Sequence, residues 1–213
     1  MSDIFPRMRK PNVIFVILVI GILAANAAAQ GRGEGGGGGQ RGGGGGAAGP
    51  PAMTLSTTAF PDGGKIPAKY SQEAEQVSPP LTWTTPPNGT MSFVVHVFDM
   101  DFAPNRGADP SQLMWLVWNI PGSSRGLPEA VPMGAKLPDG TQQISASGPQ
   151  YRGPGTQANG PMHHYAFEVY ALDTMLDLQG SANALETRAA AFKLISGHVL
   201  AKYSYVGLFR RSQ

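Results

Sequence analysis

The chain has 213 residues, which is enough for one domain with a sizeable core and short for two. It carries 16 basic and 14 acidic residues and no cysteine, so thiolate catalysis and zinc–thiolate sites are excluded. The small positive charge belongs to residues 1–29, which hold three bases and one acid and leave 13 of each in the remainder. A neutral remainder has no overall positive field to attract nucleic acid, and we expect no nucleic-acid partner.

Residues 1–29 have the layout of a secretory signal peptide. Three basic residues precede an apolar run from Val13 to Ala25, and a run of alanines ends at Ala29. The alternative is a retained membrane anchor, but the apolar run has 13 residues, whereas a membrane-spanning helix takes roughly 20. We therefore expect a cleaved signal peptide, a periplasmic or secreted protein, and no membrane span after cleavage.

Residues 30–52 form a glycine-rich segment. Thirteen glycines and no large apolar side chain lie between residues 31 and 49, so burial cannot offset the entropy that folding would remove. Basic glycine-rich segments also contact RNA, but this one has two arginines and belongs to a chain that we expect to be exported. The composition therefore favours a flexible linker.

Residues 53–213 have the pattern of one mainly β domain, a β-sandwich with a few peripheral helices. Short apolar runs are separated by proline and glycine, which is typical of an all-β sandwich. Strands are expected at about 53–58, 81–85, 92–99, 113–120, 163–172 and 203–209. One packing helix is expected, because five apolar residues recur at helical spacing: Leu185, Ala189, Phe192, Ile195 and Val199. The region 121–161 is rich in loops, and loops of this length are often functional.

Two carboxylates, Asp99 and Asp101, end the apolar strand 92–99. If the strand persists, their period-two spacing places both side chains on the same face of the sheet. Such a pair could bind a divalent cation, but a hard cation takes six or more oxygens and no further cluster of acidic residues follows. We therefore expect no metal site.

A second candidate is the start of the strand 163–172. His163 and Tyr165 share one face of that strand and form a donor pair beside a loop rich in glycine and proline. Together the two strand ends suggest a small pocket in which Asp99 orients an imidazole toward a bound oxyanion and fixes its tautomer.

Nucleophilic catalysis has little support. No serine lies at a recognisable strand-to-helix turn, which is where a serine nucleophile of the Gly-x-Ser-x-Gly type is placed. His96 and His198 lie in apolar stretches and are interpreted as structural residues. A hydrolase that uses His163 as base is the least favoured reading, and no catalytic residue is assigned.

Residues 53–211 resemble the phosphatidylethanolamine-binding protein family, in particular its bacterial Raf-kinase-inhibitor-like branch. The resemblance rests on the order and spacing of several segments: "FPDGGKIPAKYS", "SPPLTW", "DMDFAP", "MWLVWNIPG", "YRGPG…NGPMHHYAFEVYALD" and "GHVLAKYSYVGLFRR". It implies a sandwich of two antiparallel sheets with Greek-key connections and a small pocket for phosphate-like anions or phospholipid head groups. It implies no common enzymatic activity and no cofactor.

The resemblance also implies roles for individual residues. Asp99 and Asp101 are similar to the two acids of the family's Asp-Pro-Asp-Ala-Pro signature. His163 and Tyr165 are similar to the histidine and tyrosine of its Gly-x-His-Arg-Tyr segment, and Gly155 falls where a loop glycine borders the anion.

Met114 departs from the family pattern, which usually has an anion-binding histidine just before "WLVWNIP". A thioether cannot replace an imidazole donor. Losing a charge-assisted hydrogen bond of roughly 1.5–3 kcal/mol weakens phosphate binding on the order of ten- to a hundredfold, or shifts preference toward an acetate-sized or small alkyl ligand.

We therefore expect an exported, non-enzymatic protein that binds a small anion or a phospholipid head group. The alternative is a protein-interaction module that inhibits an exported hydrolase or protease through its 121–161 loops.

Overall fold

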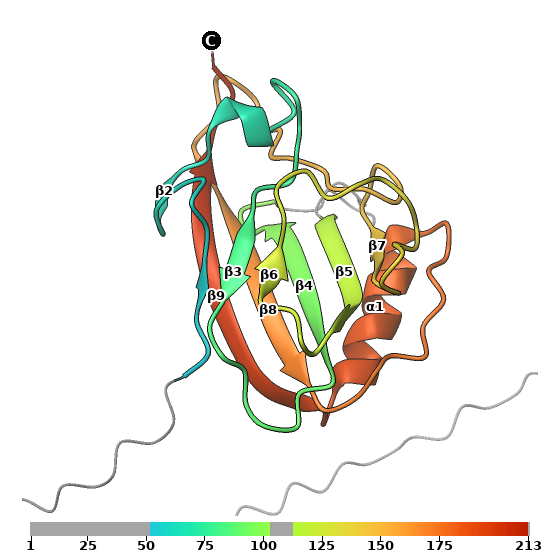
Figure 1. The fold of residues 1–213 in the computed structure, drawn as a ribbon. Helices are drawn as coiled ribbons and strands as arrows, with labels where there is room; N and C mark the ends of the chain where they lie inside the picture. Colours follow the sequence, from blue (N-terminus) through green and yellow to red (C-terminus); the bar gives the residue numbers. More distant parts are fainter. Residues whose placement is uncertain (1–51, 103–112, 213) are drawn as a thin grey trace, which may run out of the picture. The chain divides into compact units, whose positions relative to one another are not determined.

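The computed structural model describes residues 52–102 and 113–212, so the expected signal peptide and nearly all of the expected linker lie outside the described residues. Two sheets form the fold (Figure 1). The larger one has the strand order β2-β9-β8-β4-β5-β7, and the smaller one β1-β3-β6. No helix in the described part of the chain is long and apolar enough to cross a bilayer.

The elements have the following bounds. The large sheet contains β2 (Gly64–Lys65), β4 (Ser92–Asp99), β5 (Leu113–Pro121), β7 (Gln142–Ile144), β8 (His163–Leu172) and β9 (Val199–Phe209). The small sheet contains β1 (Leu55–Ser56), β3 (Leu81–Trp83) and β6 (Gly126–Leu127), and the helices are η1 (Ala68–Tyr70) and α1 (Ala184–Ile195).

The strand order confirms the expected sandwich with a Greek-key type of connection. After β5 the chain runs through β6 and β7, and β8 then returns to lie beside β4 instead of beside its predecessor. The strand pairs are antiparallel except β2 and β9, which run parallel.

The central strands of the large sheet are buried on both faces. Along β4, Phe93, Val95 and Val97 face an apolar layer shared with the small sheet. Val94 lies on the opposite face, in an apolar layer shared with α1. A strand that is covered on both faces is stabilised by apolar side chains at every position. This explains why the sequence of β4 is a nearly continuous apolar run and does not alternate between apolar and polar residues.

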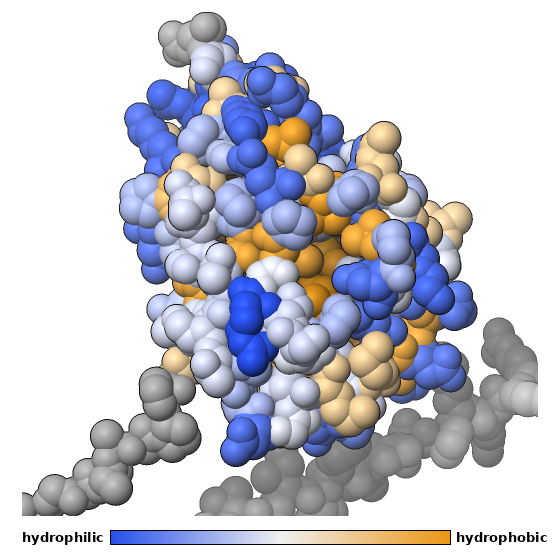
Figure 2. Space-filling model, in the orientation of Figure 1, coloured by the Kyte–Doolittle hydropathy of each residue, from blue (hydrophilic) through white to orange (hydrophobic). Residues whose placement is uncertain are grey.

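The small sheet covers only part of the face of the large sheet in front of it. Figure 2 shows mainly polar residues over the small sheet, and a band of apolar surface between it and α1. The long connections between strands cover the rest of this face of the large sheet.

The predicted helix is present but shorter, and three of its five predicted apolar residues pack against the sheet: Ile195 is buried, and Leu185 and Phe192 are partly buried. Gly197 adopts a left-handed φ of 85° after the helix, so Val199 begins β9 instead of extending α1. Its buried residues are Ala184, Thr187, Ala191 and Ile195, and Ala189 is exposed.

A buried polar cluster lies on the helix-facing side of the sheet. The carboxylate of Glu168 accepts hydrogen bonds from the Tyr170 hydroxyl at 2.5 Å and the Ser204 hydroxyl at 3.2 Å, and Lys202 Nζ lies 2.5 Å away. His96 Nδ1 lies 3.6 Å from this carboxylate, which is too long for a hydrogen bond. Its ring packs against two phenylalanine rings at 4.6 and 4.9 Å.

Candidate functional site

The side chains singled out in the sequence meet where β4 ends and β8 begins. Asp99, the last residue of β4, lies opposite Tyr165 in the antiparallel register. His163, the first residue of β8, precedes Tyr165 by two positions and therefore shares its face of the sheet. Because Tyr165 belongs to the layer between the two sheets, all three residues are directed into one end of the sandwich.

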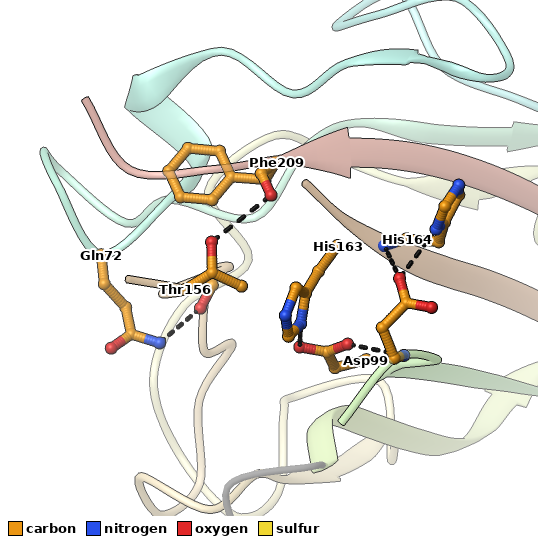
Figure 3. A network of polar contacts seen from close by, with 8 residues as sticks. Gln72, Asp99, Thr156, His163, His164 and Phe209 are labelled. Carbon is orange, nitrogen blue, oxygen red and sulfur yellow. Dashed lines mark hydrogen bonds and ion pairs between the residues drawn. The ribbon is translucent and has the colours of Figure 1, made fainter. Parts of the chain in front are cut away.

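Asp99 and His163 form a direct pair, drawn in Figure 3. The distance between Asp99 Oδ2 and His163 Nδ1 is 2.8 Å, and Asp99 Oδ1 accepts the backbone N–H of Asp101 at 2.9 Å. The aspartate is 5% exposed, so both of its oxygens are held by protein groups in a largely dry environment. With Nδ1 held by the carboxylate, Nε2 is the ring nitrogen left for a ligand.

Tyr165 supplies a hydroxyl at the same place. Burial raises the pKa of this phenol well above its usual value, and the neighbouring Asp99 carboxylate raises it further. The backbone amide of Gly155 and the hydroxyl of Thr156 act in the opposite direction. Tyr165 is therefore a neutral phenol that can donate a hydrogen bond.

Met114 reaches the site because β5 bulges. Phe98 pairs with Leu113 and Val97 pairs with Trp115, so Met114 is an extra residue between two paired positions. Bulges of this kind redirect a side chain near a functional site. Met114 is buried and contributes an apolar wall.

A cavity of about 340 Å³ surrounds these groups. Five of the six predicted site residues line it, namely Asp99, Met114, Gly155, His163 and Tyr165. Its other lining residues are Gln72, Phe102, Arg152, Thr156, Gln157, Gly160 and Pro161. This volume lies at the lower end of the range for small-molecule sites.

The sequence-based reading did not single out Gln72, Thr156 or Arg152. Gln72 donates to the carbonyl of Gly153 at 2.7 Å, and Thr156 donates to the carbonyl of Phe209 at 3.4 Å, so both fix the loop that borders the cavity (Figure 3). Arg152 is partly buried, and its Nε is buried without a hydrogen-bond partner. These residues lie in loops, where the sequence shows no periodicity that could identify them. For Arg152, the only indication in the sequence is that it is the one basic residue in an otherwise uncharged loop.

Asp101 does not line the cavity. The strand ends at Asp99, so the condition for a shared face is not met. Asp101 Oδ2 instead accepts the backbone N–H and lies 2.7 Å from Nδ1 of His164, which is on the opposite face of β8 from His163. Hydrogen bonds from the His164 backbone and ring lower the pKa of Asp101.

Gly155 permits a close approach of the loop to Gln72. A Cβ at this position would lie 2.4 Å from the Gln72 side-chain amide nitrogen. The glycine thus brings the loop backbone close to the cavity, as the sequence suggested. No group of three or more possible metal ligands occurs among residues 52–102 and 113–212.

A larger cavity of about 780 Å³ lies beside the first turn of α1. Among the described residues that line it, Glu186 is the only charged one, and most of the others are alanine, glycine or serine. We assign the functional role to the smaller cavity, because only there do an acid–imidazole pair, a phenol and a guanidinium converge.

Comparison with known proteins agrees with this fold. Residues 56–210 match the model of the phosphatidylethanolamine-binding protein family. A UPF0098 protein of Methanothermobacter thermautotrophicus is 40% identical over 163 residues, which cover 75% of this chain and 99% of the relative. A UPF0098 protein of Pyrococcus abyssi is 30% identical over 96% of this chain and 99% of its own length.

Solved structures give the same result. The chain resembles CT736 of Chlamydia trachomatis, described as a putative homologue of phosphatidylethanolamine-binding protein, with a TM-score of 0.60 and 26% identity over 76% of this chain and 99% of that one. Escherichia coli YbcL, described as a new member of the mammalian family, has a TM-score of 0.63 at 24% identity over 76% of this chain and 100% of that one, which supports the fold alone. With a family model that spans most of the chain and a 40% identical relative covered almost completely, the protein belongs to the phosphatidylethanolamine-binding protein family.

Proposed function

We propose that the protein is an exported, non-enzymatic binding protein that holds a small anion or a phospholipid head group in the cavity at the end of the sandwich. The observation that carries this proposal is the 2.8 Å contact between Asp99 and His163 inside a cavity that Tyr165 also lines. When the imidazole is protonated, Asp99 balances its charge, and Nε2 can donate to an anionic oxygen.

The hydroxyl groups of the cavity support binding in preference to catalysis. Among the described lining residues, Thr156 has the only aliphatic hydroxyl, and that hydroxyl is directed to the carbonyl of Phe209. Tyr165 is kept neutral by burial and by Asp99, so its oxygen is a poor nucleophile. Export is proposed from the signal-like residues 1–29.

Removing either partner of the Asp99–His163 pair is expected to weaken anion binding. The measurement is calorimetric titration of the full chain with phosphate, phosphoethanolamine and acetate. Asp99→Asn and His163→Ala should each show a Kd at least about tenfold higher than that of the natural protein. The reason is that each variant loses a charge-assisted interaction of roughly 1.5–3 kcal/mol.

Asp101→Asn is the matched control. It removes the same charge only two residues away, from a carboxylate that binds His164 outside the cavity, and its Kd should stay within about twofold of the natural value. Unchanged affinity in Asp99→Asn and His163→Ala, or an equal loss in Asp101→Asn, would contradict the proposal.

A further inference from the structure

Arg152 differs from the other groups of the cavity. It carries the only permanent positive charge among the described lining residues. The nearest acid in the cavity, Asp99, is engaged by His163 and forms no ion pair with Arg152. No hydrogen bond or ion pair within the described part of the chain occupies the Arg152 guanidinium, and its Nε is fully buried.

An unpaired, partly buried guanidinium is costly. Buried polar atoms in native proteins are almost always paired, and an exception calls for a bound ion, a water or a functional role as its explanation. The rest of Arg152 is well fixed, because its backbone N–H donates to the carbonyl of Met114 at 3.0 Å and its loop is held through Gln72. The charge is therefore held at the cavity although the described residues give it no partner.

We propose that Arg152 binds the ligand directly and that the ligand carries an oxyanion with two oxygens on one atom, as in a phosphate or a carboxylate. A guanidinium presents two parallel N–H donors, which match such a pair of oxygens in a bidentate contact. Met114 of β5 also lines the cavity, but its side chain has no hydrogen-bond donor. The positive charge on this side of the cavity is therefore supplied by Arg152, which belongs to a loop. This inference rests on the proposed function, since it names the residue that selects the anion.

Three variants of the full chain test it with inorganic phosphate, and acetate in parallel distinguishes the phosphate class from the carboxylate class. Arg152→Gln should raise the Kd at least tenfold, and Arg152→Lys, which keeps the charge but loses the fork, should raise it less. Arg211→Gln is the control, because Arg211 lines a neighbouring cavity and carries the same charge. It should change the Kd by less than twofold.

Thermal unfolding provides a second readout. Without ligand, Arg152→Gln should unfold at the same temperature as the natural protein or at a higher one, because an unpaired charge has been removed. Phosphate should raise the unfolding temperature of the natural protein and leave that of Arg152→Gln nearly unchanged.

The outcomes separate this inference from the proposed function. If Arg152→Gln binds phosphate and acetate as the natural protein does while His163→Ala does not, the role of Arg152 is refuted and the cavity remains a binding site. If Arg152→Gln is destabilised without ligand, the residue is structural and the inference is also refuted. If the natural protein binds neither anion, both proposals fail.

Discussion

Glu168→Gln is expected to destabilise the protein by up to about 3 kcal/mol at neutral pH and to remove much of its sensitivity to acid. Burial alone would raise the pKa of Glu168, but the neighbouring His96 ring and hydrogen bonds from Lys202 and Tyr170 outweigh burial and bring the pKa to about 2. The usual pKa of a glutamate side chain is 4.5. A difference of this size corresponds to about 3 kcal/mol of stability for the ionised form.

The sign follows from proton binding. Between pH 4.5 and 2 the unfolded chain takes up a proton at this residue before the folded chain does, so the stabilisation is complete above about pH 4.5 and is lost as the pH falls to about 2. Urea unfolding at pH 7, 4 and 2.5 measures it. The natural protein should lose stability across this range, and Glu168→Gln should be less stable at pH 7 and converge with it in acid.

Glu129→Gln is the matched control. Glu129 lies 2.9 Å from Lys69 and accepts a hydrogen bond from Tyr70 at 2.6 Å, but Glu129 and Lys69 are well exposed, so Glu129→Gln should destabilise the protein much less than Glu168→Gln. His96 should also make the folded protein less stable as the pH falls, and its effect should begin at a higher pH than that of Glu168. Burial lowers the pKa of the His96 imidazole, so protonation of the ring disfavours the folded state. An acid profile of Glu168→Gln identical to that of the natural protein would mean that the cluster does not stabilise the fold.

Trp83→Ala is expected to lower the free energy of unfolding by about 3–5 kcal/mol. Trp83 is 2% exposed and joins the small sheet to the large one, with its ring centroid 4.9 Å from that of Phe93. Its indole N–H also donates to the carbonyl of Ser124 at 3.1 Å. Alanine would leave a cavity between the layers and remove this hydrogen bond, although the Ser124 carbonyl would keep the one that it accepts from Arg125 at 2.9 Å.

Trp83→Phe separates these two effects. Phenylalanine keeps an aromatic ring but removes the donor, so the loss should be much smaller, with about 1 kcal/mol from the hydrogen bond. Denaturant unfolding of both variants gives the comparison. A loss below about 1.5 kcal/mol in Trp83→Ala would show that the small sheet contributes little to the stability of the layer.

The long strands and the short strands β1 and β3 could be predicted from the sequence, whereas three other short strands could not. The apolar runs of β4 and β8 are eight and ten residues long, and their expected bounds match the structure. Strands β2, β6 and β7 have only two or three residues, too few to show any period, and pairing with neighbours defines them. His96 was interpreted as a satisfied structural residue, yet neither of its ring nitrogens has a hydrogen-bond partner.

The same distinction holds for the site. Strand alternation and the family resemblance together pointed to Asp99, His163 and Tyr165, and the structure places them together. The place of Asp101 depended on where β4 ends, and that of Arg152 on how a loop folds back. Neither is encoded in a local pattern, because both result from contacts between distant segments.

The pairing of β4 with β8 determines how the cavity can change during evolution. Because His163 and His164 face opposite sides, a slip of one residue would exchange them and would also move the buried rings of β8 into the wrong apolar layer. Insertions or deletions within these strands should therefore be eliminated as folding defects. The residues from Arg152 to Pro161 belong to a loop and are free of this constraint, so substitutions in the loop can reshape the cavity while the acid–imidazole pair stays in place.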